Sequence, residues 1–285
     1  MRDVLLTLWQ HPLPHHFLSR IVHALMRSTA LPALRLAFMR WFVGRFGVVL
    51  ADAAEPALEA YPSFNAFFTR ALRPGARPIS PEPDAVASPA DSCVSQAGAI
   101  EAGRVFQAKG RGFSAIELLG GSAADAVPFA AGSFATLYLS PKDYHRVHMP
   151  LDGELRAMVH VPGRLFSVSP TTTRGVDRLF ARNERVAFLF DTAAGRMAYV
   201  MVGALFVSSI ETAWNGRVTP PHGHEAGGYT PMTPVVLMRG REMGRFNMGS
   251  TVILLFEAGR VGWDPALVPE AALRVGQRIA TISGR

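Results

Sequence analysis

Residues 197–210 read MAYVMVGALFVSSI, and residues 126–141 read AVPFAAGSFATLYLSP. Both runs lack charged residues, but each contains glycine and serine and is shorter than the roughly 18–20 apolar residues that a membrane-spanning helix needs. Short runs rich in β-branched and aromatic residues, broken by glycine or proline, are typical of strands. The two runs therefore predict paired strands inside a folded domain and no membrane-spanning helix.

Similar short runs recur from about residue 91 onward. Strands at this density, with few long helical patterns between them, predict a sandwich- or barrel-like β body. Residues 113–119 are expected to form a short helix, and residues 220–228, which include His222 and His224, a polar loop. The remaining expected strands cover 134–139, 154–161, 186–190, 235–239, 251–256 and a closing segment at 273–280.

The first 78 residues have a helical pattern instead. In 16–27 the polar residues His16, Arg20, His23 and Arg27 recur every three or four positions, so they share one helix face. Further helical patterns cover 33–46 and 56–72, and a Pro/Ser-rich link at 79–89 follows. The sequence predicts an α+β fold, with a helical membrane-associating region at 1–78 and a β-rich catalytic domain at 79–285.

Charge is concentrated in the N-terminal region. Residues 1–50 contain six arginines and a single acid, Asp3. Two interpretations are open: helices packed on the body of the protein, or an interfacial anchor that places aromatic residues at the acyl boundary and arginines on anionic headgroups. We favour the anchor.

The overall composition narrows the class of protein. Of 285 residues, 49% are apolar and 18% are charged, which excludes a disordered chain, a collagen and a coiled coil. The net charge of +7 comes almost entirely from arginine and favours an anionic partner, either nucleic acid or an acidic membrane surface. Cys93 is the only cysteine, so no intrachain disulfide forms and a reducing compartment is expected. The N-terminus does not have the pattern of a cleaved signal peptide.

Two histidines follow a predicted strand and turn, at His145 and His148. In a turn, side chains three positions apart fall together, so the pair could serve as two bases or as two metal ligands. A metal site would need a third ligand at suitable spacing, and no further His or Cys lies nearby in the sequence. We therefore expect no metal.

Two more segments carry reactive groups. Gly249 and Ser250 stand immediately before the apolar run 251–256, and glycine there permits a strained backbone. Asp91 lies in a predicted loop. Together with His145 and His148, Asp91 and Ser250 supply an acid, a base and a hydroxyl, the components of a nucleophilic triad. No Gly-x-Ser-x-Gly motif surrounds Ser250, which argues against an α/β-hydrolase.

At these residues the chain resembles the bacterial membrane-associated phosphatidylserine decarboxylases. Each matching segment is weak alone, but the ordered set is specific. Met248 stands where the family usually has leucine, and Ser92 where it often has glycine. The matching segments are 64–70, 72–78, 89–91, 107–110, 144–150, 183–186, 242–246 and 248–252.

The resemblance implies a self-processing pyruvoyl enzyme. His148, polarised by Asp91, would deprotonate Ser250, whose oxygen attacks the Gly249 carbonyl and splits the protein into chains 1–249 and 250–285. Ser250 would become the pyruvoyl cofactor, which forms a Schiff base with the substrate amine and accepts the electrons released on loss of CO₂. His145 would deliver a proton to the substrate Cα.

The resemblance also implies the surroundings of the enzyme. The substrate would be phosphatidylserine and the product phosphatidylethanolamine, made at the cytoplasmic side of the cell membrane by a peripheral protein. The expected partners are an anionic membrane surface and the two cleaved chains paired as a heterodimer, with homo-oligomerisation left open and no nucleic acid.

Four other readings remain to be distinguished. A pyruvoyl decarboxylase acting on a soluble amino acid would not need N-terminal helices in contact with lipid. A membrane-binding module would bind lipid without chain cleavage. A serine hydrolase would keep Ser250 intact. A nucleic-acid-binding protein is allowed by the arginine content, but no aromatic RNA-binding motif or helix-turn-helix pattern is present.

Overall fold

Strand β15 (Thr251–Phe256) lies at the centre of the fold, and all six of its residues are buried. It pairs antiparallel with β5 (Ser133–Tyr138) on one side and β9 (Gly195–Val202) on the other. A strand covered on both faces needs apolar residues at successive positions, which explains the run of Val, Ile and Leu. The strand predicted at 251–256 is confirmed with the same bounds.

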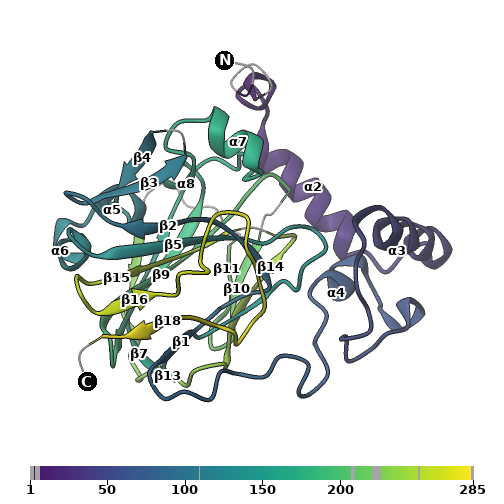
Figure 1. Ribbon diagram of the computed structural model, residues 1–285. Coiled ribbons are helices and arrows are strands. Elements are labelled where there is room, and N and C mark those ends of the chain that lie inside the picture. The colour runs from purple at the N-terminus through teal and green to yellow at the C-terminus, as the bar shows by residue number, and fades with distance from the viewer. Residues whose placement is uncertain are drawn as a thin grey trace.

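The computed structural model describes residues 3, 7–108, 110–206, 209–219, 226–249 and 251–283. The N-terminal helices stand at one side of a β-rich body (Figure 1), which confirms the predicted α+β class. The largest sheet has nine strands, and its two end strands, β12 and β17, do not pair with each other in the described ranges. In spatial order it contains β12 (Gly227–Tyr229), β7 (Gly153–Val161), β8 (Arg185–Thr192), β9, β15, β5, β2 (Ser92–Ala99) and β17 (Ala272–Leu273), with β13 (Val236–Leu237) also paired to β7.

Smaller sheets and short helices complete the body. The four-stranded sheet matters most for function, because β6 and β14 lead directly to the candidate site. Its order is β11 (Gly216–Thr219), β10 (Ser209–Thr212), β14 (Glu242–Asn247) and β6 (Arg146–His148). The others are β1 (Ala85–Ala87), β18 (Arg278–Ile282) and β16 (Val261–Trp263), and the hairpin of β3 (Arg104–Ala108) and β4 (Arg111–Ser114). The short helices are α5 (Ala115–Leu118), α6 (Ala123–Ala126), η3 (Val127–Phe129), α7 (Pro170–Gly175) and α8 (Leu179–Arg182).

The N-terminal region begins with η1 (Leu8–Gln10) and then forms two longer helices, α2 (His15–Arg27) and α3 (Pro32–Phe46), where the helical patterns at 16–27 and 33–46 predicted them. Proline at the first position of α3 suits a helix start, and Gly47, with φ +70°, ends the helix in the left-handed conformation. None of the helices in the described ranges is long and apolar enough to cross a membrane.

Four element predictions need correction. The run 126–141 is a strand only at β5, because its first residues end α6 and form η3. The helix expected over 56–72 is wrong: only η2 (Leu58–Ala60) and the short α4 (Phe64–Phe68) form there, because Pro56 and Pro62 cannot continue a helix. The run 197–210 is divided between β9 and β10, which belong to different sheets. The helix expected over 113–119 begins later, at α5, because Ser114 caps its first turn and Phe113 belongs to β4.

Two hydrophobic clusters hold the molecule together. The larger one fills the β body, and the smaller one joins α3 to α4. Met248 packs against both clusters, so the segment just before Ser250 lies where the helices meet the β body. The smaller cluster consists of Met39, Phe42, Val48, Tyr61, Phe64, Phe67 and Phe68.

Candidate active site

The two histidines and the Gly249 segment lie together because β6 pairs with β14. Arg146 is opposite Arg245 and His148 is opposite Glu242 in this antiparallel pair. His145 immediately precedes β6, and its carbonyl accepts a hydrogen bond from the Phe246 amide at 3.0 Å. Since β14 ends at Asn247, this register brings His145 beside Gly249. A Cβ atom at position 249 would lie 3.0 Å from His145 Nε2.

The imidazole of His145 is fully buried and held in one orientation. Its Nδ1 donates to the Asp143 carbonyl at 2.8 Å, so Nε2 carries the lone pair. Nε2 is buried and has no hydrogen-bond partner among the described residues. Burial, with a smaller contribution from the positive charge of Arg70, lowers the pKa of His145 to about 3. The imidazole is therefore neutral at physiological pH, and its basic nitrogen is next to Gly249.

The backbone at Met248 and Gly249 has an uncommon conformation. Met248 has φ +81° and Gly249 has φ +69°. Left-handed backbone is unfavourable for a residue with a Cβ atom, so Met248 stores strain directly before the glycine. Glycine at 249 relieves the same strain at the next position and leaves room for His145.

His148 points into a different set of contacts. Its Nδ1 donates to the Gly240 carbonyl at 2.9 Å, and its Nε2 lies 3.2 Å from the Tyr144 hydroxyl, which donates to it. Burial is the main cause that lowers the pKa of His148. Burial also raises the pKa of Tyr144 to about 12, so the phenol keeps its proton.

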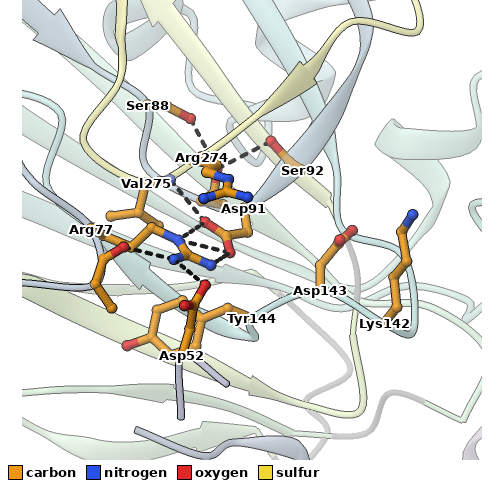
Figure 2. Close-up of polar contacts among 12 residues, drawn as sticks. Asp52, Arg77, Ser88, Asp91, Ser92, Lys142, Asp143, Tyr144, Arg274 and Val275 are labelled. Carbon is orange, nitrogen blue, oxygen red and sulfur yellow. Dashed lines mark hydrogen bonds and ion pairs between the residues drawn. The ribbon is translucent and has the colours of Figure 1, made fainter. Parts of the chain in front are cut away.

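The carboxylate of Asp91 binds an arginine (Figure 2). The Arg77 guanidinium donates to it from Nε at 2.9 Å and from Nη2 at 2.6 Å, and the Val275 amide donates at 2.9 Å. Arg77 also binds Asp52 at 2.8 Å. We expected Asp91 to contact His148 directly, but no hydrogen bond joins these two described residues. The planar guanidinium offers paired, charged donors, which a neutral imidazole cannot match. Asp91 therefore acts on His148 only through space, where its charge favours the protonated imidazole.

Some expected residues lie outside the described ranges. These are Ser250, the hydroxyl of the expected triad, and His222 and His224 of the expected polar loop. Among the described residues, no group of three or more His, Cys, Asp or Glu side chains could hold a metal ion.

An apolar cavity of about 440 Å³ opens beside the Gly249 segment. We call it the apolar cavity. It reaches from the β body to the N-terminal helices, so a ligand in it would contact both. Its walls include Met248, Gly249, Phe68, Tyr138, Phe206, Phe42, Phe46 and Trp9.

Sequence reasoning missed the role of helix α4. Its motif at 64–70 was noted as part of the resemblance, without a contact assigned to it. In the structure, Asn65 Nδ2 donates to Asn247 Oδ1 at 2.9 Å, and Asn247 in turn donates to Ser209 and Glu211. Phe68 lies against the His145 ring. The sequence signal that could have indicated these contacts is the close succession of phenylalanine and asparagine residues in the motif at 64–70.

The comparisons with known proteins agree on one family. The family model described as phosphatidylserine decarboxylase matches residues 64–281, and a second model, described as PSD, matches residues 5–47. The phosphatidylserine decarboxylase proenzyme of Marinobacter nauticus is 51% identical over 284 residues, which cover 99% of each chain. The proenzyme of the same name from Pseudomonas putida is 54% identical over 98% of each chain. That from Azotobacter vinelandii is also 54% identical, over 99% of this chain and 100% of the relative.

Proposed function

The chain belongs to the phosphatidylserine decarboxylase family, and from this premise we propose that it is a proenzyme that cleaves itself between Gly249 and Ser250 and then decarboxylates phosphatidylserine. It is accordingly an enzyme of the carboxy-lyase class. The observation that carries the proposal is the buried Nε2 of His145, which has no partner among the described residues and faces a strained Met248–Gly249 backbone beside an apolar cavity.

Self-cleavage requires a base for the Ser250 hydroxyl. We assign this role to His148, whose ring is oriented by the Gly240 carbonyl and the Tyr144 hydroxyl. The Ser250 oxygen attacks the Gly249 carbonyl, and the Gly249–Ser250 C–N bond breaks to leave an ester and a free amine. Loss of the Ser250 Cα proton then breaks the ester C–O bond and releases the Gly249 carboxylate. Water replaces the nitrogen, which leaves as ammonia.

A pyruvoyl group fits this place on the residues present. It would be made from the chain itself, next to a buried lone pair at His145 Nε2 that has no partner in the described residues. The group supplies a carbonyl that binds the substrate amine and accepts the electron pair left when CO₂ departs. His145 Nε2 accepts a proton from the substrate ammonium and returns it to Cα. A neutral imidazole can accept that proton, and the anionic substrate beside it would raise the pKa that burial holds at about 3 in the free protein.

The two chains should stay together after cleavage. Residues 250–285 contain β15, paired on both sides within the largest sheet, β17, paired with β2, and β18, paired with β1. Removing β15 would expose a fully buried apolar strand and two rows of backbone hydrogen bonds. We therefore propose a heterodimer of chains 1–249 and 250–285.

A lipid substrate is supported by the orientation of α2. Phe17, Ile21 and Leu25 recur at every fourth residue, and we call them the outward stripe; Leu25 is 62% exposed. On the polar side of the same helix, His16 binds the Gly163 carbonyl and Arg27 pairs with Glu211. Large apolar side chains exposed in one row on a helix suit a lipid surface.

The same region argues for phosphatidylserine over a soluble amino acid. Leu34 and Trp41 of α3 are also exposed, at 65% and 55%, and the apolar cavity extends to the N-terminal helices. We propose that the protein binds peripherally to an anionic membrane, on its cytoplasmic side, with the acyl chains of the substrate entering this cavity.

Intact mass of the denatured protein tests the proposal. We expect two chains separated between Gly249 and Ser250, the smaller one beginning with a pyruvoyl group, and a single unmodified chain for Ser250→Ala. A single chain for the wild-type protein, correctly folded, would exclude the pyruvoyl mechanism.

The same measurement separates the two histidines. His148→Ala should remain uncleaved, while His145→Ala should be cleaved but fail to release CO₂ from phosphatidylserine. If His145→Ala blocks cleavage and His148→Ala does not, the processing base is His145 and our assignment is wrong.

A further inference from the structure

A second cavity, of about 470 Å³, lies between α4, β10 and β14. It shares no lining residue with the apolar cavity: Asn247 lines this one, while Met248 and Gly249 line the other. We call it the basic cavity, because its walls contain more guanidinium groups than carboxylates. Its charged lining residues are Arg27, Arg70, Arg146, Arg245, Glu55 and Glu211.

Three of the four arginines have carboxylate partners. Arg27 pairs with Glu211 at 3.6 Å, and Arg146 and Arg245 share Glu242 at 2.9 and 2.8 Å. These pairs fix the guanidinium groups in the wall of the cavity. They also leave donors free, because each guanidinium has five N–H groups and one carboxylate cannot use them all.

Arg70 differs from the other three. It is only 4% exposed, and no carboxylate among the described residues lies within ion-pair distance of it. Its Nη2 makes a long hydrogen bond, 3.4 Å, to the Lys142 carbonyl, and its buried Nε has no partner in the described part of the chain. The Phe67 ring lies 5.7 Å from the guanidinium carbon and offers only a weak cation–π contact.

Asp91 and Asp143 act on Arg70 only from a distance, and a buried cation with no carboxylate in contact among the described residues is costly. Arginine cannot relieve this cost by losing its proton. An anion in the basic cavity would supply the missing counter-charge and accept the free donors. Guanidinium groups bind phosphate oxygens through paired, charged hydrogen bonds, and several of them around one cavity match an anion with several oxygens.

We propose that the basic cavity is a binding site for a phosphate oxyanion, with Arg70 as its central ligand. The site is separate from the pocket assigned to the substrate acyl chains. Two sources have this chemistry, the headgroup of an anionic phospholipid and free inorganic phosphate. The proposal goes beyond the proposed decarboxylation, since it requires neither cleavage nor turnover.

Thermal unfolding with two probes tests the site. Inorganic phosphate is titrated against sodium chloride of equal ionic strength, and monomeric dihexanoyl phosphatidylglycerol is titrated separately. The protein is the full chain, studied both as wild type and as Ser250→Ala, so that failure of the pyruvoyl mechanism leaves the binding result readable. A saturable rise in melting temperature is expected in both forms.

Variants locate the binding. Arg70→Gln should weaken the affinity about tenfold or more, and Arg27→Gln by less, because a hydrogen bond from a charged group is stronger than a neutral one. The matched control is Arg196→Gln, an exposed arginine at the start of β9 outside the cavity, which should bind as wild type. Arg27→Gln keeps the test open if Arg70→Gln does not fold.

Each outcome decides the proposal. Stabilisation by inorganic phosphate that is lost in the cavity variants supports a free-phosphate site. Stabilisation by the lipid alone, lost in the same variants, supports a headgroup site. No saturable effect beyond that of chloride from either probe, or an effect that is equal in all variants, overturns it.

Discussion

The ring of Phe68 lies against the imidazole of His145, with the ring centroids 3.9 Å apart and the planes inclined at 34°. Phe68 belongs to α4, whose other aromatic residues pack on α3, so the helical region directly supports the histidine beside Gly249. The contact keeps water from the imidazole and holds Nε2 toward the Gly249 segment. Phe68 is therefore a positioning residue in our proposal.

Phe68→Leu tests this contact, with Phe67→Leu as the matched control. Both phenylalanines are buried in the same cluster, and only Phe68 makes a ring contact with His145. We expect both variants to lose about 1 kcal/mol of stability. Only Phe68→Leu should lower kcat, by about tenfold, through misplacement of His145. In the pH profile of kcat, the fall in activity on the acidic side should also move to higher pH in this variant. The reason is that water access raises the pKa of His145 from about 3 toward 6.5. If kcat falls equally in both variants, Phe68 only packs the core and does not position His145.

The stability of the protein should fall as the pH decreases below 6.5. Unfolded His145 binds a proton at its ordinary pKa of 6.5, whereas the folded residue does so only near 3, mainly because of burial. The unfolded state therefore binds more protons between these values, and the stabilising contribution of neutral His145 is progressively lost as the pH decreases. Between pH 6.5 and 5 the wild type should lose about 1–2 kcal/mol more than His145→Gln. Identical pH dependence of the two unfolding free energies would contradict the buried, neutral imidazole.

Gly249→Ala should prevent cleavage. The new Cβ would stand 3.0 Å from His145 Nε2, at a φ of +69° that alanine tolerates poorly. Gly216→Ala is the matched control, since Gly216 has φ +65° and no neighbouring atom within 4 Å of the added carbon. Both variants should lose about 1 kcal/mol from backbone strain, and only Gly249→Ala should remain a single chain by intact mass. Wild-type cleavage of Gly249→Ala would show that the left-handed glycine backbone at position 249 is not required for attack on its carbonyl.

The Arg77–Asp91 pair should behave as one unit. Arg77→Gln leaves the mostly buried Asp91 carboxylate without its arginine and should lower the unfolding free energy by about 3 kcal/mol. Asp91→Asn should cost less, because Arg77 keeps Asp52 as a partner. The double variant should lose clearly less than the sum of the two, because it removes both charges. Chemical denaturation of the four proteins gives this comparison. Strict additivity would mean that the ion pair does not couple the two residues.

Acidic residues in the outward stripe should weaken membrane binding. Ile21→Glu/Leu25→Glu places two carboxylates on the side of α2 that we propose contacts lipid, and flotation with phosphatidylserine vesicles should drop several-fold. Val127→Glu is the control, because Val127 is 68% exposed on η3, in the β body. The melting temperatures should stay near that of the wild type in both, since the altered side chains are exposed. Equal flotation of both variants would remove α2 from the membrane contact.

Local pattern was sufficient for much of the fold. The four-residue spacing in 16–27 and the continuous apolar run at 251–256 each belong to a single element, so periodicity alone predicted α2 and β15. The helix predicted over 56–72 was wrong because two prolines interrupt the helical composition there. The single strand predicted over 197–210 was wrong because the sheet that the chain joins after Gly203 depends on strands far away in the sequence.

The sequence by itself determined the family, the α+β class and the residues available for chemistry, because these follow from residue types in a fixed order. Only the tertiary structure decided which histidine faces Gly249 and which cation binds Asp91. His145 and His148 differ by three positions in one short segment, and the register of β6 on β14 separates their surroundings. Asp91 and Arg77 meet through contacts between distant segments, and the competition between a guanidinium and an imidazole for one carboxylate is settled only when all three are folded together.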